Sequence, residues 1–524
     1  MTTNSIKHKS IDQHIDPGHR RRWAALFVLM LPVLLISVDN TVLSFAVPAL
    51  TEALLPTGPQ LLWIIDIYPL ILAGLLVPMG SLGDRFGRRR MLLIGSTGFA
   101  LVSAAAAFAS SAEQLIAARA LLGVFGAMLM PATLSLIRNI FTEANERRKA
   151  IAVWAAAFSG GAALGPIVGG YLLEHFWWGS VFLMAVPVLF PLLILGPTLI
   201  PESKDPKPAP IDPMSIVLAI STLLPIVYGI KEATTADSLL IPIAAILVGL
   251  VSGMAFTFRQ LRRKNPMLDV RLFKNPIFSG ALAVNLLSIF AFVGFIYFLS
   301  QHLQLVAGYS PIDAGLLMLP GLAMTVTFGF LAVPLVRRFK TVTVVVAGLA
   351  MNAAAYGIVA FFGQSGSVPA LMVAFCVLGA GVGMSETLSN DLALGAVPAS
   401  KAGAASAISE TAYEIGSVMG IAVLGSILNA VFAKNLLIPA GLTGQQATDA
   451  AQTLGGAHLV ASQLPGTKAD TAAALLDSAA HAFDTGVMIT SIIAVVLTVL
   501  AAFIVFCAMR GYSGDVTKKA DSTH

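Results

Sequence analysis

Long apolar segments recur along almost the whole chain, and they constrain its fold more than any other feature. Fourteen of them are long enough to cross the hydrocarbon core of a membrane as an α-helix, which takes roughly 20 apolar residues. Spans are predicted near residues 23–50, 61–82, 91–110, 114–137, 149–172, 179–200, 214–231, 239–258, 276–303, 312–336, 341–362, 369–394, 403–432 and 483–509. Since runs of this length satisfy their backbone groups in lipid as helices, we expect an all-α membrane protein.

The composition agrees with this fold class and excludes several others. Of the 524 residues, 57% are hydrophobic and 11% are charged, against about 25% charged in a typical soluble domain. This balance excludes a soluble enzyme, a nucleic-acid-binding module and a disordered chain. The two cysteines, Cys376 and Cys507, lie in separate apolar segments, so neither a disulfide framework nor a zinc site is expected. The polar, basic first 22 residues lack the pattern of a cleaved signal peptide.

Positive charges divide unequally between the two sides of the membrane. With fourteen spans, both termini and the even-numbered connections share one side, which receives 28 of the 32 lysines and arginines. The opposite side receives Lys231, Lys434 and Lys468, and Arg119 falls within a span. Because cytoplasmic loops carry an excess of Lys and Arg, both termini are expected in the cytoplasm.

Three connections are unusual in length or composition. Residues 201–213 contain five prolines, and residues 259–275 are strongly basic. Residues 434–482 form a long outer loop with two helix-like stretches around a turn at Gly466. This loop is either a tolerated insertion or a gating element or lid.

Glycine patterns repeat at an interval of eight spans. The fifth span carries Gly161, Gly165, Gly169 and Gly170, and the thirteenth carries Gly416, Gly420 and Gly425. The second and tenth spans both run into arginines eight residues after a glycine, at Arg88 and Arg337. Two six-span bundles with two inserted spans explain this interval. The predicted division is residues 1–200, 201–270 and 271–524, with the long loop 434–482 in the last part.

The second span ends in a glycine- and arginine-rich string, Gly80–Arg90. Its glycines permit a tight turn and the close approach of neighbouring helices. Asp84 either offsets a helix N-terminus or pairs with a neighbouring arginine, as a contact that breaks in one access state. An ordinary basic loop is the alternative. The motif residues are Gly80, Gly83, Asp84, Arg85, Gly87 and Arg88.

The fifth span contains Gly165-Pro166-Ile167-Val168-Gly169-Gly170 after Gly161. Glycines four residues apart leave one helix face without side chains, which allows close helix packing. Pro166 removes a backbone hydrogen bond and can bend the helix. Ordinary packing of small residues is the alternative reading.

Over nearly the whole chain these strings resemble the fourteen-span drug:proton antiporter family of the major facilitator superfamily. Gly80–Arg90 is similar to the superfamily signature between spans 2 and 3. The Gly-Pro string of span 5 is similar to the signature of its antiporter branch. Further similar strings are Val38–Val42 with Pro48, Trp63–Tyr68, Arg119 with Gly123, His175–Phe182 and Glu410–Glu414. Within the family, the chain looks like the quaternary-ammonium and methyl-viologen efflux pumps.

The resemblance implies export of lipophilic cations, such as quaternary ammonium compounds, cationic dyes and biocides, from a bacterial cell through its inner membrane. Export would be driven by inward proton flow, without a cofactor, as two bundles alternate access. The implied partners are these small molecules, protons and membrane lipid, with no nucleic acid and no obligate protein partner. One departure concerns span 10, where some relatives that handle dications have an acid and this chain has Thr325.

Ionisable residues within the spans are the candidate site, because such groups are functional by default at membrane depth. The deep acids are Asp39, Asp66, Glu386, Glu410 and Glu414, and Arg119 is the only deep cation expected. The inserted spans contain no such acid, so they are not expected to line the transport path. Glu386 follows a glycine-rich stretch of span 12 that is easily deformed.

Two of these acids have partners that the sequence already indicates. Trp63 lies three residues before Asp66, on the same helix face, and a carboxylate beside an aromatic ring suits a lipophilic cation. An interfacial position is the alternative for Trp63, and a structural hydrogen bond is the alternative for Asp66. Asp39 is expected to pair with Arg119, a pairing compatible with a role as a proton switch.

Glu410 and Glu414 lie one helical turn apart, with Tyr413 adjacent. Like charges at this spacing interact strongly, so the two carboxylates should titrate as a coupled pair. A group that binds either a proton or a cation gives antiport by competition. The alternative is that one of them faces a cytoplasmic vestibule and does little.

Two rival functions remain from the sequence. A metabolite carrier of the same fold would want more Asn, Gln and His within its spans, and the span 5 string argues against it. A membrane enzyme or sensor would need a catalytic constellation or a soluble output domain, and neither is found. The chain is therefore expected not to be an enzyme.

Overall fold

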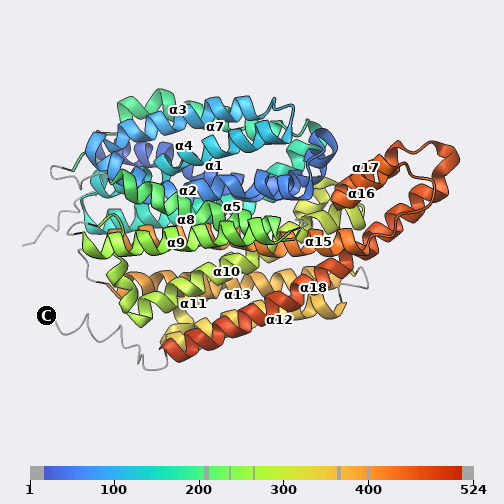
Figure 1. Ribbon diagram of the computed structural model, residues 1–524. Helices are drawn as coiled ribbons and strands as arrows, with labels where there is room; N and C mark the ends of the chain where they lie inside the picture. Colours follow the sequence, from blue (N-terminus) through green and yellow to red (C-terminus); the bar gives the residue numbers. More distant parts are fainter. Residues whose placement is uncertain are drawn as a thin grey trace, which may run out of the picture.

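The computed structural model describes residues 17–205, 212–234, 238–263, 266–362, 367–397 and 402–509. Regular structure in these ranges is helical, and most helices run side by side along one common direction (Figure 1). The first group comprises α1 (Pro17–Leu54), α2 (Gly58–Phe86), α3 (Arg88–Ala106), α4 (Ala112–Ile140), α5 (Ala144–His175), the short α6 (Ser180–Leu183) and α7 (Ala185–Leu199).

The inserted pair is α8 (Pro213–Glu232) and α9 (Leu240–Arg262). The second group follows a short 3-10 turn, η1 (Val270–Lys274). It comprises α10 (Pro276–Gln301) with the π-helical turn η2 (His302–Val306), α11 (Pro311–Arg338), α12 (Thr341–Phe362), α13 (Val368–Gly395), α14 (Ala402–Met419) with the π-helical turn η5 (Gly420–Gly425), α15 (Ser426–Asn435), α16 (Gly444–Gln452), α17 (Leu454–Gln463), the turn η6 (Gly466–Lys468) and α18 (Ala469–Met509).

Thirteen helical segments of the described chain are long and apolar enough to cross a membrane. They correspond to thirteen of the fourteen predicted spans. The exception is the span predicted at 91–110, whose helix α3 has only 19 residues and begins with three arginines. Helix α3 nevertheless runs along the bundle and packs against α4 and α7 (Figure 1).

Polar caps mark where several helices begin. Thr57 accepts a hydrogen bond from the backbone of Gln60, whose side chain accepts one from Thr57 in return. Ser111 and Ser310 cap α4 and α11 in the same way with one bond each. These side chains satisfy amide groups that have no partner within the helix, so each apolar run starts at a fixed residue.

The glycines of α5 allow it to lie directly against α1. A Cβ atom at Gly161 would lie 2.8 Å from the Cβ of Ser37, and one at Gly165 would lie 2.9 Å from the Cβ of Thr41. Gly169 faces α1 in the same way. The predicted close packing of this helix is therefore present.

The other side of α5 contacts α11 across the two bundles. A Cβ atom at Gly170 would lie 2.7 Å from the Cα of Ile312, and one at Gly315 of α11 would lie 2.5 Å from the carbonyl oxygen of Pro166. Pro166 lies inside the continuous helix α5. Helix α5 is thus packed between a helix of its own bundle and one of the other.

The thirteenth span repeats this packing eight spans later. A Cβ atom at Gly420 would lie 2.5 Å from the carbonyl oxygen of Phe290, and Gly416 stands equally close to Leu286. Both contacts bring α14 and η5 against α10, as α5 is brought against α1. Helix α14 also packs against α2 of the first bundle, as α5 does against α11 of the second. The expected six-plus-two-plus-six organisation agrees with these paired contacts.

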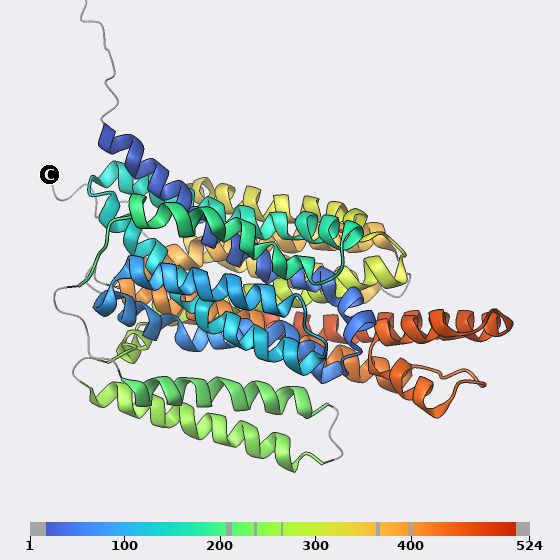
Figure 2. The same ribbon diagram turned by 90° about the horizontal axis from the view of Figure 1, so that it is seen from above.

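The inserted pair lies along one edge of the bundle, and Figure 2 shows α8 and α9 side by side there. Of the two, α8 contacts α2 and η5, whereas α9 is largely exposed on its outer face. The inserted pair is thus attached mainly through α8.

The predicted long loop 434–482 is mostly helical. Helices α16 and α17 rise beyond the bundle, and the chain returns through η6 into α18 (Figure 1). The second helix-like stretch is continuous with the last span, so that α18 has 41 residues. We refer to the end of the molecule that carries this projection as the hairpin end, and to the opposite end, where α1 begins and α18 finishes, as the termini end (Figures 1 and 2).

Hydrogen bonds between the two bundles gather at the hairpin end. The Ser300 hydroxyl donates to the carbonyl of Ser44 at 2.9 Å, and the Gln304 amide donates to that of Phe45 at 3.3 Å. The backbone N–H of Ile312 donates to Glu174 at 3.3 Å. No such bond joins the bundles nearer the termini end in the described ranges. In the described part of the chain, the hydrogen bonds between the bundles are therefore concentrated at the hairpin end.

Candidate functional site

Asp39 of α1 and Arg119 of α4 form a buried ion pair. Their closest atoms, Oδ2 and Nη1, are 2.6 Å apart, and the two side chains are 7% and 2% exposed. The predicted pairing of the two residues is thus present. It joins the first and fourth helices of one bundle.

Arg119 has further partners on α2 that hold it in place. Its Nε donates to the carbonyl of Ile64 at 3.1 Å and its Nη2 to that of Ile65 at 3.4 Å. Its guanidinium carbon lies 4.5 Å from the centre of the Tyr68 ring. A guanidinium presents several donors in a fixed plane, so this one side chain ties three helices together.

A second buried ion pair joins α2 to the inserted helix α8. Lys231 Nζ lies 2.9 Å from Asp66 Oδ2, and both side chains are fully buried. The same ammonium lies 4.1 Å from the centre of the Trp63 ring. Trp63 and Asp66 therefore share a helix face as predicted, and together they hold a cation.

Lys231 corrects two expectations. The sequence predicts it on the outer surface, at the end of an apolar run, and predicts Arg119 as the only deep cation; the structure shows Lys231 buried as well. Packing of α8 against α2 instead encloses Lys231 within the membrane-spanning part of the molecule. The inserted pair, expected to lie apart from the transport path, thus contributes a charged side chain to one of the candidate residues.

The acids of α14 lie in the second bundle. Glu414 is 5% exposed, and its Oε2 has no hydrogen-bond partner among the described residues. Glu410, one turn nearer the termini end, is half-buried and within electrostatic range of Glu414 and of Arg138 of α4. The two carboxylates thus lie within electrostatic range of each other across one helical turn.

Aromatic side chains bridge the two bundles beside these acids. The ring of Tyr413 lies edge-on to that of Phe158 of α5, with centres 5.9 Å apart, and Phe158 stacks on Trp154. The Tyr413 hydroxyl is within electrostatic range of Glu386 and Glu414. Rings of the two bundles therefore meet beside carboxylates of the second bundle.

Tyr68 connects the two groups of charges. Its buried hydroxyl has no hydrogen-bond partner among the described residues, and it is within electrostatic range of Asp39, Arg119 and Glu414. Arg119 in turn acts electrostatically on Asp66. The candidate residues thus form a chain of interacting groups that runs from α8 through the first bundle to α14.

Glu386 lies on α13, half-buried, beside the helix in which an acid is missing. Its helix approaches α11 so closely that a Cβ atom at Gly379 would lie 2.9 Å from the Thr325 hydroxyl. That hydroxyl donates to the carbonyl of Gly321 at 3.2 Å. Glu386 therefore lies on the helix that packs against α11 at Thr325.

The string Gly80–Arg90 forms the end of α2 and the start of α3 at the termini end. Gly87 makes the turn with a φ of 116°, a left-handed conformation that favours glycine. Asp84 pairs with Arg88 at 2.7 Å, so the second of its two predicted roles is the one observed. Arg85 is exposed, with its guanidinium carbon 5.9 Å from the Phe86 ring, and Gly80 and Gly83 lie in α2 against Pro131 and Met91.

The segment after α7 completes this motif, and the sequence did not reveal it. Glu202 accepts hydrogen bonds from the backbone N–H groups of Arg89 and Arg90, at 3.1 and 3.2 Å. Ser203 accepts one from the Arg88 side chain at 2.9 Å. Glu202 rather than Asp84 thus offsets the N-terminus of α3. Nothing in the local sequence marks it, because the contact spans more than a hundred residues.

Metal binding finds no support in the described part of the chain, where no group of three or more His, Cys, Asp or Glu side chains could hold an ion. What the arrangement offers chemically is a set of buried carboxylates beside aromatic rings. Such groups bind protons and organic cations.

Comparison with known proteins places this chain among transporters. The profile of the Major Facilitator Superfamily matches residues 29–421. The chain is 55% identical over 490 residues to the multidrug efflux pump LfrA of Mycolicibacterium smegmatis, covering 94% of this chain and 97% of that protein. It is 39% identical over 467 residues to the methyl viologen resistance protein SmvA of Salmonella typhimurium, covering 88% and 93%.

Solved structures agree on the fold. A bacterial homolog of the human lysosomal transporter Spinster, in an inward-facing and unoccupied conformation, superposes with a TM-score of 0.63 at 18% identity. The match covers 94% of this chain and 98% of that one.

Proposed function

Because this chain belongs to the major facilitator superfamily and is a multi-pass protein of the cell membrane, we propose that it is a proton-coupled exporter of lipophilic cations. The names of its relatives, a multidrug efflux pump and a methyl viologen resistance protein, support this class of substrate. The observation that carries the proposal is the Asp66–Trp63 site, which already holds an ammonium group between a carboxylate and a ring.

The coupling we propose is competition at the buried carboxylates. A carboxylate that binds either a proton or an organic cation exchanges one for the other when access alternates. Asp66 and Trp63 provide the cation site, and Glu410, Glu414 and Glu386 with Tyr413 provide further acids and a ring. Asp39 changes between its protonated and ionised forms, and Arg119 holds the Asp39 side chain in place.

Alternating access in this proposal is a movement of residues 1–200 against residues 271–524, with 201–270 between them. The positive-inside distribution favours the termini end as the cytoplasmic one. The hydrogen bonds between the bundles at the hairpin end are then contacts on the outer side. The glycine contacts of α5 and α14 provide surfaces on which helices slide without side chains interlocking.

The direct test is transport of ethidium into vesicles by the purified protein, with and without an imposed pH gradient. We expect uptake that requires the gradient and is abolished by a protonophore. Equal movement of the cation with no gradient of pH or voltage would contradict antiport.

More than one proton per monovalent cation is expected, because the chain holds five candidate acids where competition needs one. Exchange of one proton for one monovalent cation moves no charge, and only the pH gradient drives it, with about 1.4 kcal/mol per pH unit. Each further proton adds about 2.3 kcal/mol per 100 mV. Glu414→Gln should then reduce the response to voltage at equal pH. Voltage-insensitive export by the unaltered protein would contradict the multi-proton scheme.

A further inference from the structure

The ammonium group of Lys231 occupies the place that a substrate cation would take. We propose that Lys231 is an intramolecular occupant of the Asp66–Trp63 site, and that an exported cation binds there by displacing it. This inference rests on the proposed function and gives the inserted helices a part in it.

The contacts of Lys231 are those of a bound organic cation. Its Nζ lies 2.9 Å from the Asp66 carboxylate and 4.1 Å from the centre of the Trp63 ring. Neither the ammonium nor the two carboxylate oxygens make any other hydrogen bond among the described residues. One charge and one ring face are therefore all that fix this side chain, and a lipophilic cation offers the same two interactions.

Exchange at this site is favoured by hydration. A lysine ammonium is a compact, strongly hydrated charge, and a buried pair without further hydrogen bonds gains little over its desolvation cost. A lipophilic cation of diffuse charge loses less hydration on entering. It can therefore compete for Asp66, provided that Lys231 finds a polar place to move to.

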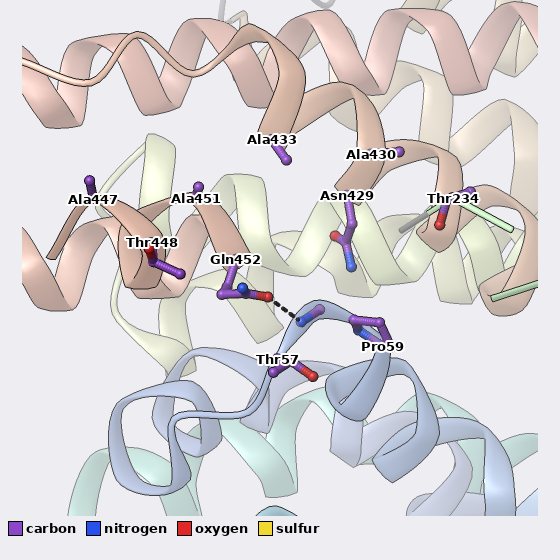
Figure 3. Close-up of a pocket in the computed structure, with 11 residues that line it drawn as sticks. Thr57, Pro59, Thr234, Asn429, Ala430, Ala433, Ala447, Thr448, Ala451 and Gln452 are labelled. Carbon is purple, nitrogen blue, oxygen red and sulfur yellow. Dashed lines mark hydrogen bonds between the residues drawn. The ribbon is translucent and has the colours of Figure 1, made fainter. Parts of the chain in front are cut away.

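A cavity of about 740 Å³ lies at the hairpin end, and its mostly apolar lining includes the polar side chains of Thr57, Thr234, Asn429, Thr448 and Gln452. Thr234, in the turn that follows α8, connects the cavity to Lys231, because its hydroxyl donates to the Lys231 carbonyl at 3.0 Å. Asn429 and Gln452 point into the same space toward the start of α2, where Gln452 accepts from the backbone N–H of Gly58 at 3.3 Å (Figure 3). This cavity can receive the displaced ammonium group.

The arrangement also explains how an empty carrier avoids a bare buried charge. When the cation leaves, Lys231 returns and offsets Asp66. A site that its own side chain occupies most of the time binds a competitor more weakly, in proportion to the fraction of time that it is free. Removing the occupant should therefore tighten binding.

The test is equilibrium binding of tetraphenylphosphonium to the purified full-length chain in lipid nanodiscs, at about pH 8.5 to limit competition by protons. We expect Lys231→Met to bind at least about tenfold more tightly than the unaltered protein. Lys434→Met, which removes an exposed lysine of the same end on α15, should bind as the unaltered protein does. Asp66→Asn combined with Lys231→Met should lose the gain.

Lys231→Gln serves as a second uncharged variant if Lys231→Met does not fold, since its amide can still donate to Asp66. Unchanged or weaker binding by a folded variant of either kind would overturn the inference. If the unaltered protein binds and exports the cation in that case, the proposed function stands alone. Failure of the unaltered protein to bind or export any lipophilic cation would overturn both.

Discussion

Two buried ion pairs lie within the same bundle region, and they differ in how many partners fix the cation. Arg119 bonds Asp39, two backbone carbonyls and the face of Tyr68. Lys231 has one carboxylate oxygen and one ring. Both cations are 2% exposed or less, so burial does not distinguish them.

This difference in the number of partners indicates different roles for Arg119 and Lys231. A guanidinium with every side satisfied cannot leave without stranding several groups at once, and it therefore stabilises the fold. An ammonium with two contacts can exchange with another cation. The first pair also lies wholly within one bundle, whereas the second joins that bundle to an inserted helix. Each of the following changes tests whether this division is correct.

The largest effect is expected from Arg119→Met. It leaves the Asp39 carboxylate buried without a partner, which costs about 3–5 kcal/mol, and it strands two carbonyls on α2. We expect a large fall in melting temperature and the loss of transport, measured by thermal unfolding in detergent and by dye efflux. Arg20→Met, at an exposed arginine near the start of α1, is the matched control and should leave both unchanged. A stable, active Arg119→Met protein would contradict the role of Arg119 in stabilising the fold.

The spans and the Asp39–Arg119 pair could be predicted from the sequence, because both follow from the cost of placing polar groups in lipid. Apolar length alone locates thirteen spans, and two opposite charges deep in one bundle must offset each other. Apolar length does not identify helix α3 in the same way, because its three initial arginines lower its mean hydropathy. Neighbouring helices nevertheless pack against it.

Lys231 and Glu202 could not be placed from the sequence for a different reason. A lysine at the end of an apolar run looks like a boundary residue, and only the packing of α8 on α2 turns it inward. Glu202 reaches the start of α3 over 113 positions of sequence. Contacts of this kind depend on tertiary structure and leave no local periodic pattern.

The second largest effect is expected from removing the charge of Asp66 or of Asp39, and the two changes should differ in what they impair. Asp66→Asn should weaken binding of a lipophilic cation more than about tenfold, because its charge attraction is lost in a site of low dielectric. Asp39→Asn should lower the melting temperature more and the affinity less, since Arg119 then loses its charge partner. Both are isosteric, so each is the control for the other. Equal loss of affinity in the two variants would contradict separate roles.

A smaller difference is expected at the two aromatic rings. Trp63→Leu removes the ring face from the Lys231 site and should weaken cation binding by about 0.5–2 kcal/mol, with little change in stability. Tyr68→Leu removes the ring beneath Arg119 and should lower stability by a similar amount without changing cation binding. Binding isotherms and melting curves of the two variants decide between them. If Trp63→Leu lowered stability and Tyr68→Leu weakened cation binding, the two rings would not have the same separate roles as Lys231 and Arg119.

The smallest effect is expected from a third acid, Asp212 at the start of α8, whose arginine partners are partly exposed to water. Asp212 lies 2.8 Å from Arg259 and 3.2 Å from Arg263, whose side chains are 32% and 37% exposed. The hydrogen bond from Arg259 holds the pKa of Asp212 well below its usual value. Asp212 also caps α8 by accepting from the backbone of Ser215.

Asp212→Asn keeps the cap and removes the charge, so it should cost about 1 kcal/mol or less at neutral pH. The sign of its pH dependence follows from the lowered pKa. A carboxylate whose pKa is lower in the folded state stabilises the fold above its unfolded pKa of about 4, and this contribution fades as pH falls below that value. The melting temperatures of the unaltered protein and of Asp212→Asn should therefore converge below about pH 4. Asp391→Asn, at an exposed carboxylate on α13, is the control for removal of one negative charge. If the gap for Asp212→Asn widened on acidification, the pair would not be the source of the effect.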